Sequence, residues 1–136
     1  MVQVFERGIT AGPQDIDELG HVNNAAFVRW IQDMATAHWI AVAPPAHVEA
    51  YVWVVTRHEI DYLRAVLPGE TVTGRTWVSE APKGARFDRH VEFVGGDGRL
   101  RVRARTTWAI LDRASGKPIR VPPVVAAPFI APSAGG

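Results

Sequence analysis

The sequence contains no cysteine, which excludes disulfide bonds, thiolate metal sites and a cysteine nucleophile. It also lacks an uninterrupted apolar stretch long enough to span a bilayer, and it lacks a strong charge of either sign. The 15 Lys and Arg residues nearly balance 14 Asp and Glu residues, so the net charge of +1 provides no strong field for nucleic acid or membrane. We therefore expect a cytoplasmic protein with no nucleic-acid partner and no membrane partner.

Motifs of several enzyme classes are missing as well. The five histidines are scattered without zinc-ligand spacing, and the sequence has no Walker-type or dinucleotide-type glycine loop and no Gly-x-Ser-x-Gly elbow. These absences argue against kinases, dehydrogenases, serine esterases and metal catalysis. We expect no metal ion and no redox cofactor.

The patterns that are present predict one helix and several strands. Residues 2–10 alternate as a strand does, and apolar positions between about residues 24 and 41 follow helical spacing, in an arc wider than one stripe. A helix that is apolar over so wide an arc must be covered on more than one side. The remaining strand-like runs, separated by turn signals, are residues 51–64, 71–79, 86–94 and 99–112.

These elements predict an α+β fold in which a curved antiparallel sheet of five or more strands wraps one long central helix. A chain of 136 residues, 47% of them hydrophobic, suits a single domain with one packed core. We place that domain at residues 1–122. Residues 123–136 are rich in Pro, Ala and Gly and are expected to form a frayed or disordered tail.

The last two strand-like runs predict a hairpin around the four-residue loop Gly95–Gly98. Its register is self-consistent by hydrophobicity and by charge when Val94 pairs with Arg99. A row of arginines at every second position is then a solvated sheet face with cross-strand ion pairs, and binding of an acidic partner is the alternative. The pairs expected on the two faces are Phe93 with Leu100, Val91 with Val102, Glu92 with Arg101, Asp88 with Arg105 and His90 with Arg103.

The segment Asp15–Asn24, continued without a break by Ala25–Trp30, joins a carboxylate-bearing loop to the start of the predicted helix. Backbone N–H groups in the first turn of a helix have no partner within the helix, and they favour negative charge nearby. A base and an anion-stabilising group can therefore share one small volume. This arrangement suits attack on a carbonyl group.

Several motifs occur together in one order along the chain. They are Asp-x-Asp-x-x-Gly-His-Val-Asn-Asn from Asp15, then Phe27, Arg29-Trp30, Glu59–Arg64, Thr106–Asp112 and Ser115–Pro118. In their order and spacing they resemble the 4-hydroxybenzoyl-CoA thioesterase family of the hotdog fold, over roughly residues 4–122. The resemblance implies an acyl-CoA thioesterase that assembles as a homodimer or homotetramer.

The resemblance also implies roles for the loop and the helix start. Asp17 matches the acidic residue of the family and should stay ionised at neutral pH, either as a nucleophile on the thioester carbonyl or as a base on water. The backbone N–H of Asn24 matches the oxyanion donor. His21 is expected to fix the turn by a hydrogen bond, with substrate contact as an alternative, and Asp15 is expected to satisfy turn N–H groups.

Further residues are candidates for binding the substrate. Phe27, Trp53 and Val55 are possible walls of an acyl pocket, and Lys83 and Arg86 match the region where the family binds the phosphates of coenzyme A. The predicted hairpin turns Arg89 toward the core face, from which it would extend to the rim or to a subunit contact. Coenzyme A enters only as part of the substrate.

Two other functions remain open at this point. One is hydrolysis of acyl groups carried by acyl carrier protein, which would need basic residues around the site. The other is a hotdog domain that binds acyl thioesters or a protein partner without catalysis. The acyl group itself, whether aromatic, short or long, is not determined by the sequence.

Overall fold

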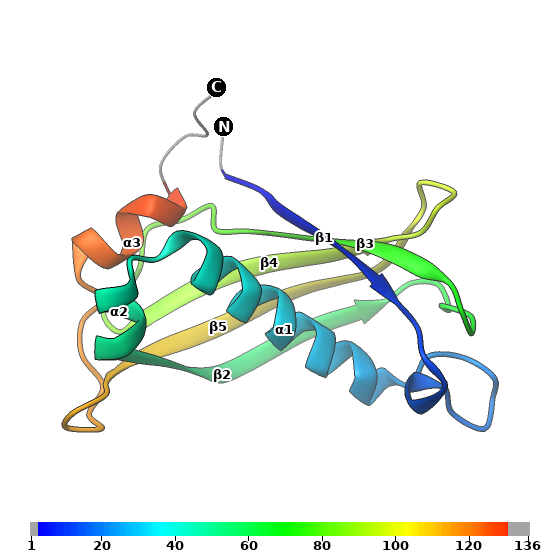
Figure 1. Ribbon diagram of the computed structural model, residues 1–136, viewed down its shortest axis with the longest axis horizontal. Coiled ribbons are helices and arrows are strands. Elements are labelled where there is room, and N and C mark those ends of the chain that lie inside the picture. Colours follow the sequence, from blue (N-terminus) through cyan, green and yellow to red (C-terminus); the bar gives the residue numbers. More distant parts are fainter. Residues whose placement is uncertain (1–2, 131–136) are drawn as a thin grey trace.

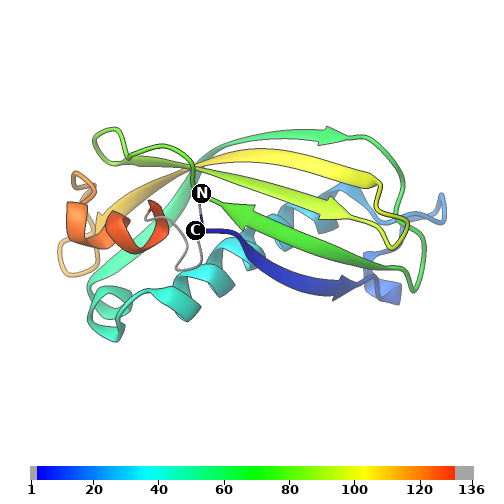
Figure 2. The ribbon, with the colours of Figure 1, turned by 90° about the horizontal axis from the view of Figure 1, so that it is seen from above.

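The computed structural model describes residues 3–130 and places one long helix against a curved sheet. In Figure 1, helix α1 lies lengthwise along the sheet, and Figure 2 shows the strands arching over it. The elements in chain order are β1 (Phe5–Thr10), a short 3-10 turn (Pro13–Asp15), α1 (Asn24–Val42), α2 (Pro45–Ala50), β2 (Tyr51–Tyr62), β3 (Thr71–Trp77), β4 (Arg86–Val94), β5 (Leu100–Asp112) and α3 (Pro123–Ile130).

The five strands form one sheet in the order β1-β3-β4-β5-β2, and every neighbouring pair is antiparallel. The predicted α+β architecture is therefore confirmed. Strands β1 and β2 are the two edges, so one side of each pairs with no other strand within residues 3–130.

Helix α1 begins where the sequence predicts it. The side chain of Asn23 accepts a hydrogen bond from the Ala25 N–H at 2.7 Å and so caps the first turn. Opposite the middle of the helix, a Cβ on Gly74 of β3 would lie 2.7 Å from Met34 Sδ, so glycine allows the helix and strand to approach closely. No helix within residues 3–130 is long and apolar enough to cross a membrane.

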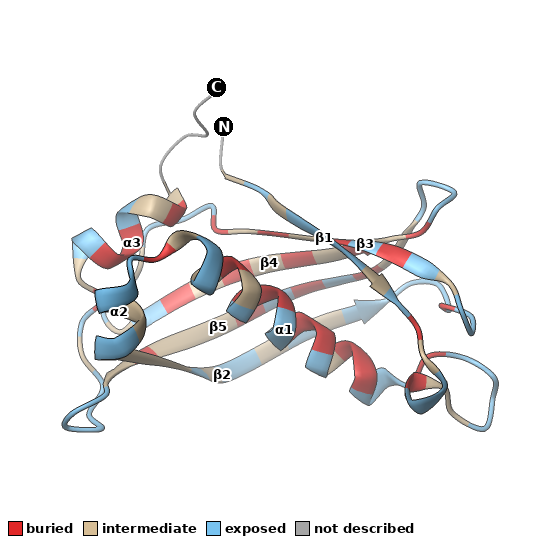
Figure 3. Cartoon of the chain, in the orientation of Figure 1, coloured by how far each residue is buried: buried red, intermediate tan, exposed pale blue. Residues whose placement is uncertain are grey.

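Two apolar clusters lie along α1, at its two ends, and they differ in composition. Figure 3 shows the buried positions running along the helix and the central strands. The cluster under the first half contains Phe27, Trp30, Ile31, Met34 and Phe93, and the cluster at the other end contains Val78, Phe87, Ile110, Val125 and Phe129. Among the buried polar residues outside both clusters are His38, Thr76, Arg89 and Thr106.

The β4–β5 hairpin has the predicted faces but a different register. Phe93 pairs with Val102 instead of Leu100, because residues 95–99 form the connection and a bulge at Phe93/Val94 takes up one more residue. A shift of two residues keeps every side chain on its predicted face, so Val91 and Phe93 are still buried. The predicted cross-strand residue pairs were therefore wrong, whereas the predicted face of the sheet for each side chain was right.

The arginine row on β5 forms ion pairs with neighbouring strands, as expected. Arg103 contacts Asp61 of β2 at 3.2 Å, and Arg105 contacts Asp88 of β4 at 2.6 Å. Arg101 differs from these two, because only 11% of its side chain is exposed.

The chain from residue 123 to residue 130 is helical, which differs from the frayed tail expected there. Helix α3 begins at Pro123, a position that suits proline because the first N–H of a helix has no partner within it. Val125 and Phe129 are buried in the second apolar cluster and hold the helix in place. Residues 131–136, the rest of the expected tail, lie outside the described residues.

Candidate active site

The loop before α1 is held in place by Asp15, whose carboxylate is buried. Its Oδ2 accepts a hydrogen bond from the Gly12 N–H at 3.0 Å, and its Oδ1 pairs with the guanidinium of Arg29 on α1. Its backbone carbonyl accepts a hydrogen bond from the Asn23 N–H at 2.7 Å. Asp15 therefore joins the loop to the first turns of the helix, which agrees with the structural role expected for it.

Asp17 is half-buried and lies in a tight turn. Its backbone N–H donates to the His21 carbonyl at 2.9 Å, and its carboxylate Oδ1 accepts from the Leu19 N–H at 2.9 Å. Gly20 completes the turn with a φ of 78°, a left-handed conformation that glycine adopts without strain. Within residues 3–130 the second carboxylate oxygen, Oδ2, has no hydrogen-bond partner, so this oxygen is available to a ligand.

The first turn of α1 leaves one backbone donor unused. Asn23 accepts hydrogen bonds from Ala25, through its side chain, and from Ala26, through its carbonyl. The N–H of Asn24 donates to no acceptor in the described part of the chain. The Asn24 carbonyl accepts from the Tyr62 hydroxyl at 3.3 Å, and partial burial raises the pKa of that phenol, so it remains a donor at neutral pH.

A cavity of about 460 Å³ brings these groups together, a volume within the usual range for small-molecule sites. Four of the predicted site residues line it, namely Asp17, His21, Asn24 and Phe27. The opposite wall comes from the end of β2 and the loop after it, residues 62–65. Sequence reasoning assigned no role to that wall, although Tyr62 and Arg64 belong to a motif that supported the family resemblance.

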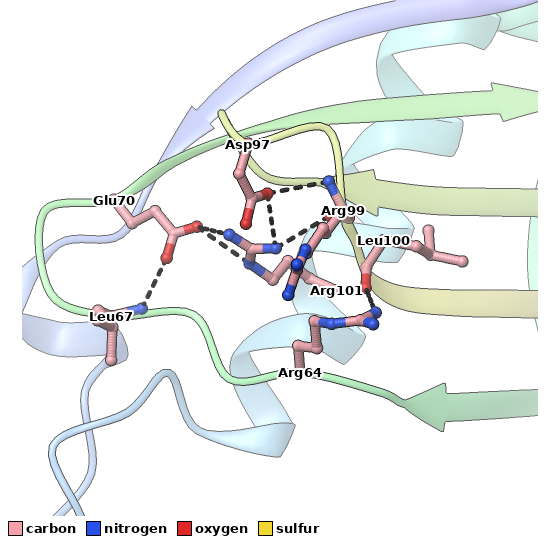
Figure 4. A network of polar contacts seen from close by, with 7 residues as sticks. All are labelled: Arg64, Leu67, Glu70, Asp97, Arg99, Leu100 and Arg101. Atoms are coloured by element: carbon pink, nitrogen blue, oxygen red, sulfur yellow. Dashed lines mark hydrogen bonds and ion pairs between the residues drawn. The ribbon is translucent and has the colours of Figure 1, made fainter.

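The loop that forms this opposite wall is fixed by Arg101, as Figure 4 shows. The Arg101 guanidinium contacts the Glu70 carboxylate at 3.1 Å and Asp97 at 3.0 Å, and so ties the loop after β2 to the hairpin. The same loop accepts a hydrogen bond from the Val22 N–H at the Val66 carbonyl, at 2.9 Å. Arg101 therefore supports the cavity without lining it.

The remaining substrate-binding candidates lie elsewhere in the single chain. Trp53 and Arg89 line a separate cavity of about 230 Å³ beside the last turns of α1, and Val55 lines neither cavity. Lys83 and Arg86 are exposed and close the turn before β4 with two backbone hydrogen bonds, at 2.9 and 3.0 Å. The structure thus does not bring these five residues to the Asp17 cavity within one chain.

Arg89 is buried, which corrects the expectation that it reaches the rim. Its Nη1 donates to His38 Nδ1 at 2.8 Å and to Thr76 Oγ1 at 3.0 Å. Burial lowers the pKa of Arg89 to about 10, and burial together with the nearby Arg89 cation lowers the pKa of His38 to about 4. At neutral pH this pair is therefore a cationic arginine and a neutral histidine.

No group of three or more His, Asp or Glu side chains in residues 3–130 is arranged to hold a metal ion. The larger cavity contains one carboxylate, that of Asp17, and lies at the start of α1, where the Asn24 N–H has no acceptor within residues 3–130. Such a pair can polarise a carbonyl group and attack it or activate water toward it.

A sequence profile of the thioesterase-like superfamily matches residues 11–129. The chain belongs to this superfamily. The matched span includes the Asp17 loop, the wall at residues 62–65 and nearly all of α3. No curated protein is similar enough in sequence to match this thioesterase-like chain.

Several solved structures share the fold of this superfamily member at low sequence identity. A putative oleoyl thioesterase from Lactobacillus plantarum superposes with a TM-score of 0.84 at 16% identity, covering 94% of this chain and 51% of that one. A 1,4-dihydroxy-2-naphthoyl-CoA thioesterase from Synechocystis gives 0.78 at 15%, covering 95% and 97%. A hypothetical protein from Staphylococcus aureus in complex with CoA gives 0.82 at 15%, covering 96% and 85%.

This chain spans about half the length of the Lactobacillus protein. Identities this low show the fold alone. The hotdog fold predicted from the sequence is confirmed.

Proposed function

We propose that this protein hydrolyses acyl-CoA thioesters in the cavity at the first turn of α1, as a member of the 4-hydroxybenzoyl-CoA thioesterase family. The observation that carries the proposal is that one cavity of about 460 Å³ holds both the Asp17 carboxylate and the start of α1, where the Asn24 N–H has no acceptor within residues 3–130. Membership of the thioesterase-like superfamily supports thioester hydrolysis as the reaction.

In the proposed reaction, the thioester carbonyl oxygen accepts a hydrogen bond from the Asn24 N–H, which stabilises negative charge as the carbonyl carbon is attacked. If Asp17 is the nucleophile, its Oδ2 forms a mixed anhydride, the C–S bond breaks, the CoA thiolate leaves and takes a proton, and water then cleaves the anhydride. If Asp17 is the base, it takes a proton from water as the water oxygen attacks the carbonyl, and CoA leaves as its thiol. Both routes release a free acid and CoA.

The shape of the sheet supports a dimer. The edge strand β2, of 12 residues, pairs with no other strand on one side among the described residues, and pairing with a second copy would cover that side. An antiparallel pairing places the Tyr51 end of one β2 beside the Tyr62 end of the other. The partner's Lys83 and the partner's Arg86 then become candidates for the phosphates of CoA, which the single chain does not bring to Asp17.

Thiol release across a panel of aromatic, short-chain and long-chain acyl-CoAs and acyl carrier protein thioesters tests the proposal. We expect hydrolysis of at least one CoA ester, and we expect Asp17→Asn to lower kcat by about 10³-fold or more, because it removes the only proposed base or nucleophile. Glu18→Gln is the matched control, since Glu18 is exposed, adjacent in sequence and outside the cavity. It should change kcat less than about twofold.

Each alternative gives a different result in the same experiment. Faster hydrolysis of the acyl carrier protein thioesters than of the CoA esters would indicate an acyl carrier protein thioesterase. Binding of acyl-CoA by the wild type without thiol release would indicate a non-catalytic domain and would refute the proposed reaction. An Asp17→Asn variant that keeps kcat within tenfold of the wild type would refute the role of Asp17.

A further inference from the structure

A second cavity, which the proposed reaction does not use, lies at the other end of α1. Its volume is about 230 Å³, and it lies beside Trp39, fifteen residues after Asn24, or about 22 Å along the helix at 1.5 Å per residue. The rings of Trp39 and Phe129 stack at 5.7 Å, and Trp39 and Trp53 meet edge to face at 5.7 Å. The other aromatic residues that line it are Tyr51, Phe87 and Trp108.

One wall of this aromatic cavity carries a buried positive charge. Arg89 lines the cavity and is only 9% exposed, and both hydrogen bonds recorded for its side chain come from Nη1. A guanidinium has five N–H donors, and within residues 3–130 no hydrogen bond is found from Nε or Nη2. Within residues 3–130 no Asp or Glu oxygen lies within 4 Å of this guanidinium.

The groups that do contact Arg89 are neutral. His38 Nε2 lies 2.8 Å from Gln3 Oε1, which can only accept, so Nε2 carries the proton and Nδ1 accepts from Arg89. Thr76 contributes a hydroxyl oxygen. A buried cation whose contacts are all neutral is costly, and an anion placed beside it recovers much of that free energy.

The same cavity lining contains a buried donor without a partner among the described residues. The indole N–H of Trp108 is buried and has no hydrogen-bond partner in the described chain. Trp108 pairs with Phe87 across β4 and β5, and Arg89 pairs with Thr106 in the same register, so all four residues share the inward face. At the cavity lining Arg113 adds another cation, held by the backbone carbonyls of Glu49 and Val48.

We propose that this cavity binds a small apolar monocarboxylate, whose carboxylate pairs with Arg89 while its hydrocarbon part lies among the aromatic rings. The volume equals that of about eight liquid water molecules, which suits an acid of the size of hexanoate or benzoate. The aromatic lining supplies apolar contact, and the buried guanidinium selects a planar anion. Within one chain the lining of this site contains neither Asp17 nor Asn24, and binding there requires no hydrolysis.

Titration with hexanoate tests the proposal, with hexanamide as the matched neutral compound. Trp39, Trp53 and Trp108 line the cavity, so tryptophan fluorescence reports its occupancy, and a rise in Tm reports binding independently. We expect saturable binding of hexanoate that is at least tenfold tighter than that of hexanamide. Arg89→Gln should bring hexanoate down to the affinity of hexanamide.

Two further variants separate this site from the proposed active site and from a folding defect. Ala35→Leu places a larger side chain in the cavity lining and leaves residue 89 unchanged, so it should abolish binding of both compounds, which keeps the test valid if Arg89→Gln fails to fold. Asp17→Asn should leave hexanoate binding unchanged. Equal affinity for acid and amide, no binding at millimolar hexanoate, or full binding by Ala35→Leu would each overturn the proposal.

Discussion

The two ends of α1 hold cavities of opposite character. At the first turn, a larger cavity contains a half-buried carboxylate, Asp17, and an unused amide donor. At the last turns, a smaller aromatic cavity contains a buried cation, Arg89. The partial positive charge at the start of a helix favours an anion and the partial negative charge at its end favours a cation, so each charge complements the nearer end of α1.

The two ends of α1 also differ in the side-chain packing next to their cavities. Below the Asp17 loop, Phe27 packs against Trp30 at 5.1 Å and Phe93 at 5.8 Å, in an apolar cluster. At the other end, Arg89 and His38 interrupt the apolar packing with hydrogen-bonded polar groups. The Asp17 cavity therefore borders an apolar cluster through Phe27, whereas the second cavity has a cation among aromatic rings, an arrangement suited to recognition of an anion.

The largest expected effects come from a matched pair of core variants, one at each end of α1. Phe27→Ala and Phe129→Ala each remove a nearly buried ring, at 3% and 2% exposure, and each should lower the free energy of unfolding by about 3–5 kcal/mol. Only Phe27 lines the Asp17 cavity, so only its variant should also lower thioester hydrolysis per folded molecule. Urea unfolding and thiol release measure the two effects.

Phe27→Leu is the control for the first of these variants, because it keeps most of the buried volume. If Phe129→Ala lowers hydrolysis per folded molecule as much as Phe27→Ala does, the two ends of the helix are not separate functional units.

Lowering the pH should reduce the free energy of unfolding through His38, at the Arg89 end of α1. The expected loss is smaller than that of the core variants. The pKa of His38 is 6.5 in the unfolded chain and about 4 in the folded one, so between these values protons bind mainly to the unfolded chain. Stability should therefore fall by about 3 kcal/mol as the pH drops from 6.5 to 4, and this contribution should change no further below that range. His58, whose pKa burial also lowers, acts in the same direction.

Urea unfolding at several pH values, on the wild type and on His38→Gln, measures this effect. The variant should show a flatter pH dependence between 6.5 and 4. The carboxylates whose pKa the fold lowers, Asp88, Asp97 and Asp112, lose their contribution only below about pH 4, so they do not confuse the result. Equal slopes for variant and wild type would contradict the assignment to His38.

The sequence predicted the Asp17 end better than the Arg89 end, for a physical reason. The turn, the Asn23 cap and the start of α1 are local features whose geometry is set by neighbouring residues, so their positions follow from spacing. The wall at residues 62–65 is distant in sequence from Asp17, and only the folded sheet places it opposite the loop. The motif was visible in the sequence, but its position in space was not.

At the other end, strand alternation correctly turned Arg89 inward, but alternation does not identify the residue across the core. His38 contacts Arg89 from α1, 51 positions away in sequence. The expectation for residues 123–130 was wrong because their apolar residues, among them Val125 and Phe129, pack on the second cluster, whereas the prediction relied on Pro, Ala and Gly content. Pro123 at the first helical position was the local signal of α3.

The smallest expected effects come from two arginines that each support one end. Arg101 joins Glu70 to Asp97 behind the Asp17 cavity, and Arg113 donates to the carbonyls of Val48 and Glu49 beside the aromatic cavity. Arg101→Met and Arg113→Met should each lower Tm by roughly 4 °C, because each removes a few partly exposed polar contacts while keeping the aliphatic stem. Thermal unfolding measures this loss for both.

The two variants should differ in their effects on KM for an acyl-CoA and on hexanoate binding. Arg101→Met frees the loop that carries residues 62–65, so it should raise KM for an acyl-CoA severalfold and leave hexanoate binding unchanged. Arg113→Met should weaken hexanoate binding by a few fold and leave KM unchanged, since it removes one cation at the aromatic cavity. Changes in both readouts for either variant would mean that α1 transmits a disturbance from one end to the other, and the two cavities would then have to be treated as one coupled system.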